Sequence, residues 1–249
     1  MAKKASGGLL ENVKTIVYAG LIAVGIRTVA FEPFNIPSGS MIPTLLVGDY
    51  LFVSKYSYGY SRYSLPLSPN LFSGRIFGHT PERGDVAVFR LPSDTSVDYI
   101  KRIVGLPGDR IQMRAGQLYI NGTQVPRTRL GTFTATDEYT HSEVDALYTE
   151  LLPNGRSHEL LKRSDDGRAN NTEEFKVPDG YVFAMGDNRD NSADSRFSAS
   201  ERGVGYLPIE NLVGRAEFIF FSVDAEAPWW QVWEWPFEIR WRRLLHGIS

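Results

Sequence analysis

Apolar residues are concentrated near the N-terminus, where residues 15–31 read TIVYAGLIAVGIRTVAF and are interrupted only by Arg27. A helix of this length covers about 25 Å at about 1.5 Å per residue. A bilayer core is about 30 Å thick, so the run is just long enough to cross it. We therefore predict a membrane-spanning helix over 15–31. A cleavable signal peptide and a buried amphipathic helix are the alternatives.

Three lysines, Lys3, Lys4 and Lys14, precede this run. Positive charge tends to stay on the cytoplasmic side of a membrane. Residues 1–14 are then expected in the cytoplasm, with the chain after residue 31 on the opposite side.

After Glu32 the apolar positions fall into short runs separated by turn residues, a pattern typical of β-strands. Asn121-Gly122 follows one such run and is a strong turn signal. Long helical periodicity is absent from this part of the sequence, so we predict a mostly β protein. The expected strands are Tyr50–Lys55, Asp85–Arg90, Tyr99–Val104, Arg110–Arg114, Gln117–Ile120, Tyr181–Met185 and Arg215–Ser222.

Two stretches depart from this pattern. Residues 56–82 are rich in Tyr, Ser, Gly and Pro, which predicts an extended loop. Residues 121–176 are polar and irregular, which predicts a surface insertion or a small second domain. The main core would then consist of 32–120 and 177–228.

The segment 229–249 is unusual because it carries every tryptophan of the chain, interleaved with arginine. Trp and Arg together suit a membrane interface. An apolar cover on the sheet is the alternative, and the two do not exclude each other. The residues concerned are Trp229, Trp230, Trp233, Trp235, Trp241, Arg240, Arg242 and Arg243.

Composition excludes several kinds of chemistry. A formal net charge of −2 does not favour nucleic acid as a partner. The absence of Cys excludes disulfides, thiolate metal sites and a Cys nucleophile. The four histidines are scattered without ligand spacing or an acyl-transfer motif, so neither a metal nor a Ser-His-Asp triad is predicted.

A serine and a lysine offer another route to nucleophilic chemistry. Residues 36–45 read IPSGSMIPTL and hold Ser38 and Ser40 in a turn between prolines. A serine hydroxyl needs a base, and a lysine serves if burial keeps it neutral. Lys101 lies among apolar residues on a predicted strand, where it and Arg102 face opposite sides. A fall of its pKa from about 10.4 toward 7 would make it a base.

Three longer motifs carry a family resemblance. The sequences EPFNIPSGSMIPTLLVGDYLFVSKYSYG (32–59), DYIKRIVGLPGDR (98–110) and MGDNRDNSADSR (185–196) resemble the serine, lysine and GDN boxes of bacterial type I (leader) signal peptidases. Their order matches the family, and so does the apolar segment ahead of the serine. The strands RGDVAVFR (83–90) and LVGRAEFIFF (212–221) extend the resemblance.

The resemblance implies a fold and a set of catalytic roles. The fold would be an antiparallel, mostly β core of the signal peptidase and repressor self-cleavage type, with an inserted smaller β region over 121–176. Ser40 would be the nucleophile and Lys101 the general base. Ser38 would share the oxyanion hole with the Ser40 N–H. Ser192 would orient the lysine, and a supporting charge network would consist of Arg102, Asp187, Asp194 and Arg196.

The same resemblance implies two shallow substrate pockets that admit small residues at P1 and P3. The first would be lined by Ile36, Pro37, Met41, Leu45, Tyr99 and Ile100. The second would be lined by Phe34, Leu51, Val88, Asp98 and Ile100.

The implied activity is removal of signal peptides from exported preproteins by a membrane-anchored serine endopeptidase, without metal or cofactor. The expected location is the bacterial inner membrane, crossed once by 15–31, with the catalytic domain outside the cytoplasm. Preproteins and lipid are the expected partners, and the export machinery is left open. The alternatives are an inactive membrane-tethered peptide-binding β module, a self-cleaving repressor-type peptidase, and a conjugation-type processing peptidase.

Overall fold

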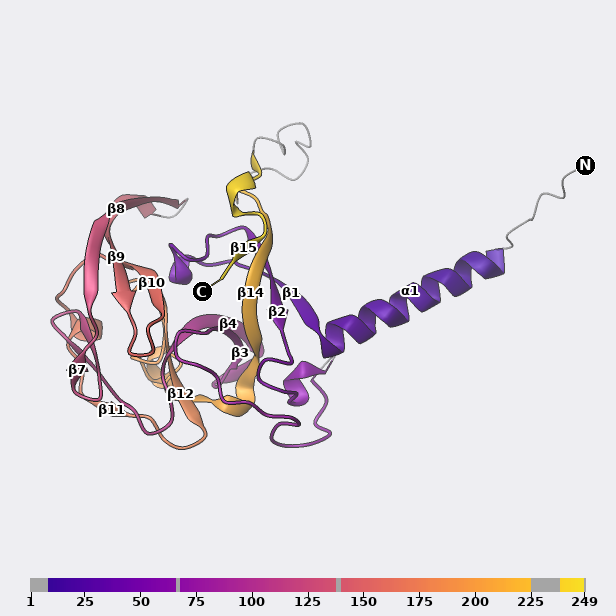
Figure 1. Ribbon diagram of the computed structural model, residues 1–249, viewed down its shortest axis with the longest axis horizontal. Helices are drawn as coiled ribbons and strands as arrows, with labels where there is room; N and C mark the ends of the chain where they lie inside the picture. The colour runs from indigo at the N-terminus through magenta and orange to yellow at the C-terminus, as the bar shows by residue number, and fades with distance from the viewer. Residues whose placement is uncertain (1–8, 66–67, 138–139, 225–237, 249) are drawn as a thin grey trace, which may run out of the picture.

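The computed structural model describes residues 9–65, 68–137, 140–224 and 238–248 (Figure 1). One α-helix in these residues, α1 (Leu9–Val29), projects from a body built of β-strands. The strands are β1 (Phe31–Asn35), β2 (Asp49–Ser54), β3 (Val86–Leu91), β4 (Asp94–Gly105), β5 (Arg110–Arg114), β6 (Gln117–Ile120), β7 (Thr123–Gln124), β8 (Arg127–Asp137), β9 (Thr140–Leu151), β10 (Ser157–Lys162), β11 (Phe175–Lys176), β12 (Tyr181–Met185), β13 (Leu207–Pro208), β14 (Leu212–Ser222) and β15 (His246–Gly247). The predicted fold class, mostly antiparallel β with one N-terminal apolar helix, is confirmed.

Most of the side chains described in helix α1 are exposed, and Thr28 is half-buried. Within it, Glu11–Val29 is long and apolar enough to cross a membrane, and none of its most apolar window is buried. The alternative of a buried amphipathic helix is therefore wrong for the described residues. The helix begins earlier than the predicted residue 15 and ends at Val29, because Phe31 already pairs with Ser54 in the first strand.

The main sheet has the order β1-β2-β14-β3-β4-β12-β13, with β15 paired to β14. Its named pairings are antiparallel, and Val88 of β3 lies opposite Ile100 of β4. One buried apolar cluster joins Met41, Leu45, Leu51 and Val88. A second cluster, with Ala87 and Ile103, packs elsewhere in the same strands. Alternate side chains of β3 and β4 thus enter different clusters, which leaves both faces of these strands covered.

Two smaller sheets lie beside the main sheet. One has the order β10-β9-β8 and the other the order β11-β5-β6-β7. Most of their strands come from 121–176, the segment whose polar composition hid β8, β9 and β10. Figure 1 places β8–β10 on the side of the body away from α1. The remaining strands, β5 and β6, precede residue 121, so the four-stranded sheet joins chain from both sides of that position.

The predicted strands agree closely with the observed ones. The bounds of β5, β6 and β12 are those predicted, and β2, β3, β4 and β14 overlap their predictions with different ends. The turn at Asn121-Gly122 has φ of 54° and 79°, the left-handed values that this dipeptide adopts readily.

A small ionic cluster fixes the joint between α1 and the sheet. Glu32 of β1 contacts Arg27 of α1 at 2.6 Å and the buried Lys55 Nζ at 2.9 Å. The Tyr60 hydroxyl donates to the Val29 carbonyl at 2.7 Å, and the Lys55 N–H donates to the Ala30 carbonyl at 3.0 Å. The end of the helix is thus held from both sides.

The C-terminal residues return to the main sheet. β15 pairs with β14, and Arg243 reaches the buried Asp49, with its Nε donating to Oδ1 at 3.0 Å. Trp241 is largely exposed. Trp229, Trp230, Trp233 and Trp235 lie outside the described residues, so the two interpretations of this segment remain predictions.

Replacement of a core residue tests the packing of the four-stranded sheet. Leu118 of β6 is fully buried, together with Ile111 and Phe183. We expect Leu118→Ala to lower the free energy of unfolding by about 2–5 kcal/mol through the cavity it leaves. Chemical unfolding in detergent measures this. The control Leu130→Ala, at an exposed position of β8, should change stability by no more than about 0.5 kcal/mol. Equal losses for the two variants would contradict the assigned core.

Candidate active site

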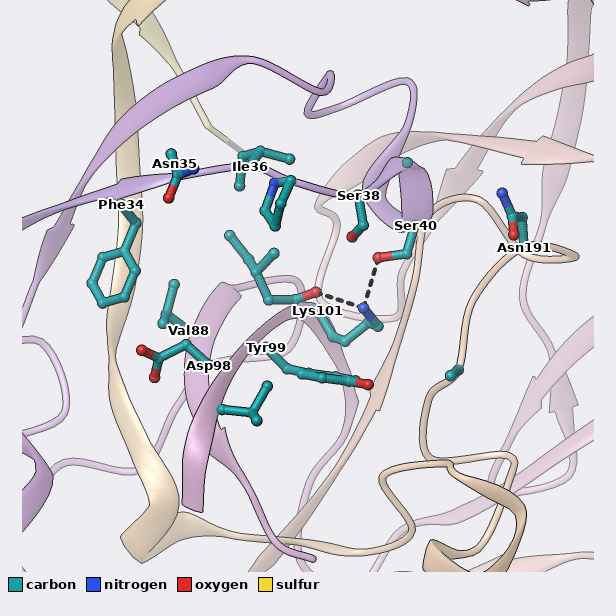
Figure 2. A pocket seen from close by; sticks show the side chains of 15 residues that line it. Phe34, Asn35, Ile36, Ser38, Ser40, Val88, Asp98, Tyr99, Lys101 and Asn191 are labelled. Atoms are coloured by element: carbon teal, nitrogen blue, oxygen red, sulfur yellow. Dashed lines mark hydrogen bonds between the residues drawn. The ribbon is translucent and has the colours of Figure 1, made fainter. Parts of the chain in front are cut away.

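The predicted nucleophile lies in a short 3-10 turn, η1 (Gly39–Met41), that follows β1. Ser38 precedes the turn in an extended conformation, with φ −137° and ψ 152°. Met41 is fully buried and fixes the turn against the core, while Ser40 is 9% exposed. Ser38 and Ser40 both line the same cavity (Figure 2).

Lys101 reaches the same point from β4. Its Nζ donates to Ser40 Oγ at 2.7 Å and to the Ile100 carbonyl at 2.9 Å (Figure 2). The side chain is buried, and its Nζ lies 5.2 Å from the centre of the Tyr99 ring. Burial lowers the pKa of Lys101 to about 8, against the opposing effect of the carboxylates Asp194 and Asp187. A substantial neutral fraction therefore exists near physiological pH.

Arg102, the next residue of β4, is also buried because both faces of the strand are covered. Its guanidinium binds Asp187 in a two-pronged contact, Nε to Oδ1 at 2.9 Å and Nη2 to Oδ2 at 2.8 Å. Nη1 donates to the Gly84 carbonyl at 2.8 Å. The pKa of Asp187 is lowered by Arg102, which outweighs the opposing effect of burial. A charged pair is thus maintained under the strand that carries Lys101.

Asp194 and Arg196 form a second buried pair. Arg196 Nε donates to Asp194 Oδ1 at 2.9 Å, and the Gly186 N–H donates to Asp194 Oδ2 at 3.0 Å. The four predicted network residues are therefore brought near the site, but as two pairs.

Ser192 lies close to the turn without the predicted hydrogen bond. A Cβ placed on Gly186 would meet both Ser192 Oγ and the Ser40 carbonyl, so the three groups crowd together. Ser192 Oγ is buried and has no hydrogen-bond partner within the described chain. Its role in orienting Lys101 stays a prediction.

A cavity of about 530 Å³ opens beside Ser40 and Lys101. Figure 2 shows Phe34, Val88 and Asp98 to one side of Ser40 and Asn191 to the other. The predicted residues on its wall are Phe34, Ile36, Pro37, Ser38, Val88, Asp98, Tyr99 and Ile100. Met41, Leu45 and Leu51, also predicted to contact substrate, are buried in the core behind this wall. Asn35, Gly39, Val97, Asn191 and Ala193 line the cavity and were missed, although each adjoins a quoted motif or lies within one.

A further buried ionic cluster was missed. Arg189 binds Glu150 of β9, with Nη1 to Oε1 at 3.0 Å and Nη2 to Oε2 at 2.6 Å. His158 of β10 lies between this pair and the site, its Nε2 at 3.5 Å from Glu150 and 3.8 Å from Asp187. Burial lowers the pKa of His158 to about 4, so the imidazole is neutral. Arg189 lies inside the third motif, whereas Glu150 and His158 carry no signal in the sequence.

In the described residues, no group of three His, Cys, Asp or Glu side chains is placed to hold a metal ion. The chemistry that this geometry supports is attack by a serine hydroxyl with the help of a buried amine.

Comparison with known proteins agrees with this chemistry. Residues 9–221 match the family model described as signal peptidase, peptidase S26. The signal peptidase I of Rickettsia typhi is 45% identical over 91% of this chain and 85% of its own length. That of Rickettsia prowazekii is 45% identical over 84% of this chain and 78% of its own length.

Among solved structures, a signal peptidase I from Enterococcus faecalis is 24% identical, with a TM-score of 0.31 over 55% of this chain and 97% of that one. This likeness is too low to support the assignment, which rests on the sequence matches.

The chain belongs to the signal peptidase family, peptidase S26. It is of the bacterial type I kind, a hydrolase whose substrates are the signal peptides of preproteins.

The buried histidine makes stability depend on pH. His158 has a pKa of about 4 in the folded state against an ordinary 6.5. The unfolded chain therefore binds more protons between these values, and stability falls as pH decreases through this window. We expect a loss of about 2 kcal/mol between pH 7 and pH 5 from this group, measured by chemical unfolding. His158→Gln should flatten the dependence, and an unchanged slope would show that another group is responsible.

Proposed function

We propose that the chain is a membrane-anchored serine endopeptidase that cleaves preproteins after small residues, with Ser40 as nucleophile and Lys101 as general base. The observation that carries the proposal is the 2.7 Å contact between Lys101 Nζ and Ser40 Oγ. The contact occurs in a buried setting that lowers the pKa of the amine to about 8. A neutral amine at this distance is able to accept the hydroxyl proton.

The reaction would proceed in two halves. Lys101 takes the proton as Ser40 Oγ attacks the scissile carbonyl, and the resulting ammonium returns a proton to the leaving amine. Lys101 then takes a proton from the water that attacks the Ser40 ester, and the ammonium returns this proton to Ser40 Oγ as the ester bond breaks. The Ser40 N–H and the Ser38 hydroxyl would donate to the oxyanion, a contribution of about 3–4 kcal/mol for one donor. The position of Ser38 on the wall of the cavity that Ser40 and Lys101 also line supports this assignment.

The cavity wall supports the choice of small side chains. Ile36, Val88 and Ile100 present branched apolar groups to the cavity that Ser40 lines, and they belong to a buried apolar cluster with Met41, Leu45 and Leu51. A larger side chain would have to displace packed residues, which is discrimination by exclusion. The peptide would lie extended along Asp98–Ile100 and add its backbone to the strand.

The exposed apolar helix supports an anchor in the bilayer. α1 has the length of a membrane span, and the large apolar side chains described in it, from Val13 to Val29, are exposed. We place the protein in the bacterial inner membrane with the N-terminus cytoplasmic, because Lys3 and Lys4 precede the span and Lys14 lies near its N-terminal end. Lipid is then a partner, and the catalytic body lies on the side where signal peptides emerge. Proteins of the export machinery are open as further partners.

Cleavage of a preprotein with an Ala-x-Ala site tests this proposal. In vesicles, the unaltered protein should cut after the second Ala, while Ser40→Ala and Lys101→Met should be at least 1,000-fold slower although folded. A matched substrate with Phe in place of that Ala should resist cleavage. Normal cleavage by Lys101→Met would exclude the lysine as base, and normal cleavage of the Phe substrate would exclude the proposed specificity.

The pH dependence of the rate identifies the base. Only neutral Lys101 accepts a proton, so kcat/KM should rise about tenfold per pH unit and level off near pH 8. His158→Gln is the control, because a limb that belongs to Lys101 keeps its position in this variant. If kcat/KM instead levelled off near pH 6–7, and this pH dependence were lost in His158→Gln, the assignment of Lys101 as the base would be overturned.

A further inference from the structure

The inserted sheet touches the loop that follows β12. The Leu161 N–H of β10 donates to the Asp187 carbonyl at 2.9 Å, and the Arg189 N–H donates to the Leu161 carbonyl at 3.0 Å. These bonds form a parallel bridge between Leu161 and Asn188. The segment 187–189 is therefore an extension of the inserted sheet as well as part of the main core.

The same segment holds the nucleophile turn. The Asn188 N–H donates to the Ser40 carbonyl at 3.1 Å. The Asn188 side-chain amide donates to the Gly39 carbonyl at 3.1 Å. Two consecutive carbonyls of the turn thus depend on the position of one residue, and that residue depends on its neighbours on either side.

An ion pair links the segment to the inserted sheet more firmly than the backbone bonds alone. Glu150 and Arg189 make two parallel hydrogen bonds, and their side chains are 1% and 2% exposed. A two-pronged contact between a carboxylate and a guanidinium fixes direction as well as distance. Its burial removes competing water. Arg189 therefore has one strongly favoured orientation, which Glu150 defines.

We propose that Glu150, in the inserted sheet, is a positioning residue for the peptidase reaction. Through Arg189 it fixes segment 187–189, and through Asn188 that segment fixes the turn that presents Ser40 to Lys101. This inference rests on the proposed role of Ser40 as nucleophile. It assigns to the insertion a function in catalysis beyond covering the core.

The expected signature is a loss of turnover without a comparable loss of substrate binding. The polar contacts of the Glu150 side chain are with Arg189 and His158, neither of which lines the cavity, so KM should stay within about threefold. A displacement of the reacting atoms by about 1 Å can cost about 100-fold in rate. We expect Glu150→Gln, which removes the charge and keeps the shape, to lower kcat at least about tenfold.

The experiment measures kcat and KM on the full-length protein in vesicles, normalised to the folded fraction. Asp145→Asn is the matched control, because Asp145 is a buried acid of the same strand that pairs with Arg163 instead. Its kcat should stay within about twofold of the unaltered protein. If Glu150→Gln fails to fold, Glu150→Asp takes its place, since it keeps the charge but is too short for the two-pronged contact.

A double variant distinguishes positioning from general weakening of the sheet. If Glu150 acts through Arg189, the kcat of Glu150→Gln with Arg189→Gln should equal that of Arg189→Gln alone. If the loss of kcat in the double variant were instead the product of the losses in the two single variants, the proposal would be overturned. It would also be overturned by a folded Glu150 variant with normal kcat, or by an Asp145→Asn variant with the same loss. Ser40→Ala is measured alongside: its full activity would refute the proposed nucleophile, whereas its inactivity with normal Glu150 variants would refute only the positioning role.

Discussion

The burial of one amine beside one hydroxyl is the constraint on which the rest of the structure depends. A lysine on a covered strand is costly as an ammonium, and this cost is what makes it available as a base. The strand that buries Lys101 on one face necessarily points Arg102 to the other. Arg102 stays charged when it is buried, because the pKa of a guanidinium is too high for it to lose its proton. Its burial is therefore unfavourable without the carboxylate of Asp187. A reactive lysine on this strand thus requires a charged pair beneath it.

The need to pair buried charges also determines contacts farther from Lys101. Asp187 lies in the loop after β12, and the same loop supplies Asn188 to the nucleophile turn and Arg189 to Glu150. The pairs Arg102–Asp187 and Arg189–Glu150 each connect different elements, so the main sheet and the β10-β9-β8 sheet are joined to this loop through polar contacts. Breaking one partner of such a pair leaves an unpaired charge in the interior. Precise placement at Ser40 is therefore a property of the whole assembly.

What could be predicted from the sequence follows from how local each signal is. β5 and β6 were found to the residue, because short alternating runs and the Asn121-Gly122 turn mark their ends. β8 and β9 were missed, because both faces of this hairpin carry polar or exposed side chains such as Leu130 and Val144. The meeting of Ser40 and Lys101 was foreseen from motifs. Glu150 was not, since a single acid in a polar strand gives no sign of a partner 39 positions away.

The pocket shows a related limit. Apolar residues near Ser40 divide into those that form the wall and those that support it from behind. Nothing in their type separates Ile36 from Leu45 or Leu51, since all three are large and aliphatic. All three belong to one buried cluster, and only the folded structure shows that Ile36 also lines the cavity whereas Leu45 and Leu51 do not.

The ionic cluster of Arg27, Glu32 and Lys55 affects how far the active site lies from the membrane. If α1 crosses the bilayer as proposed, the ion pairs of this cluster would fix the direction of the helix relative to β1 and the main sheet. Ser40 would then stand at a fixed height above the membrane plane. The choice of a cleavage site would then depend partly on the distance between that site and the membrane surface. A preprotein whose small residues emerge too close to the lipid, or too far from it, would escape even with side chains that fit.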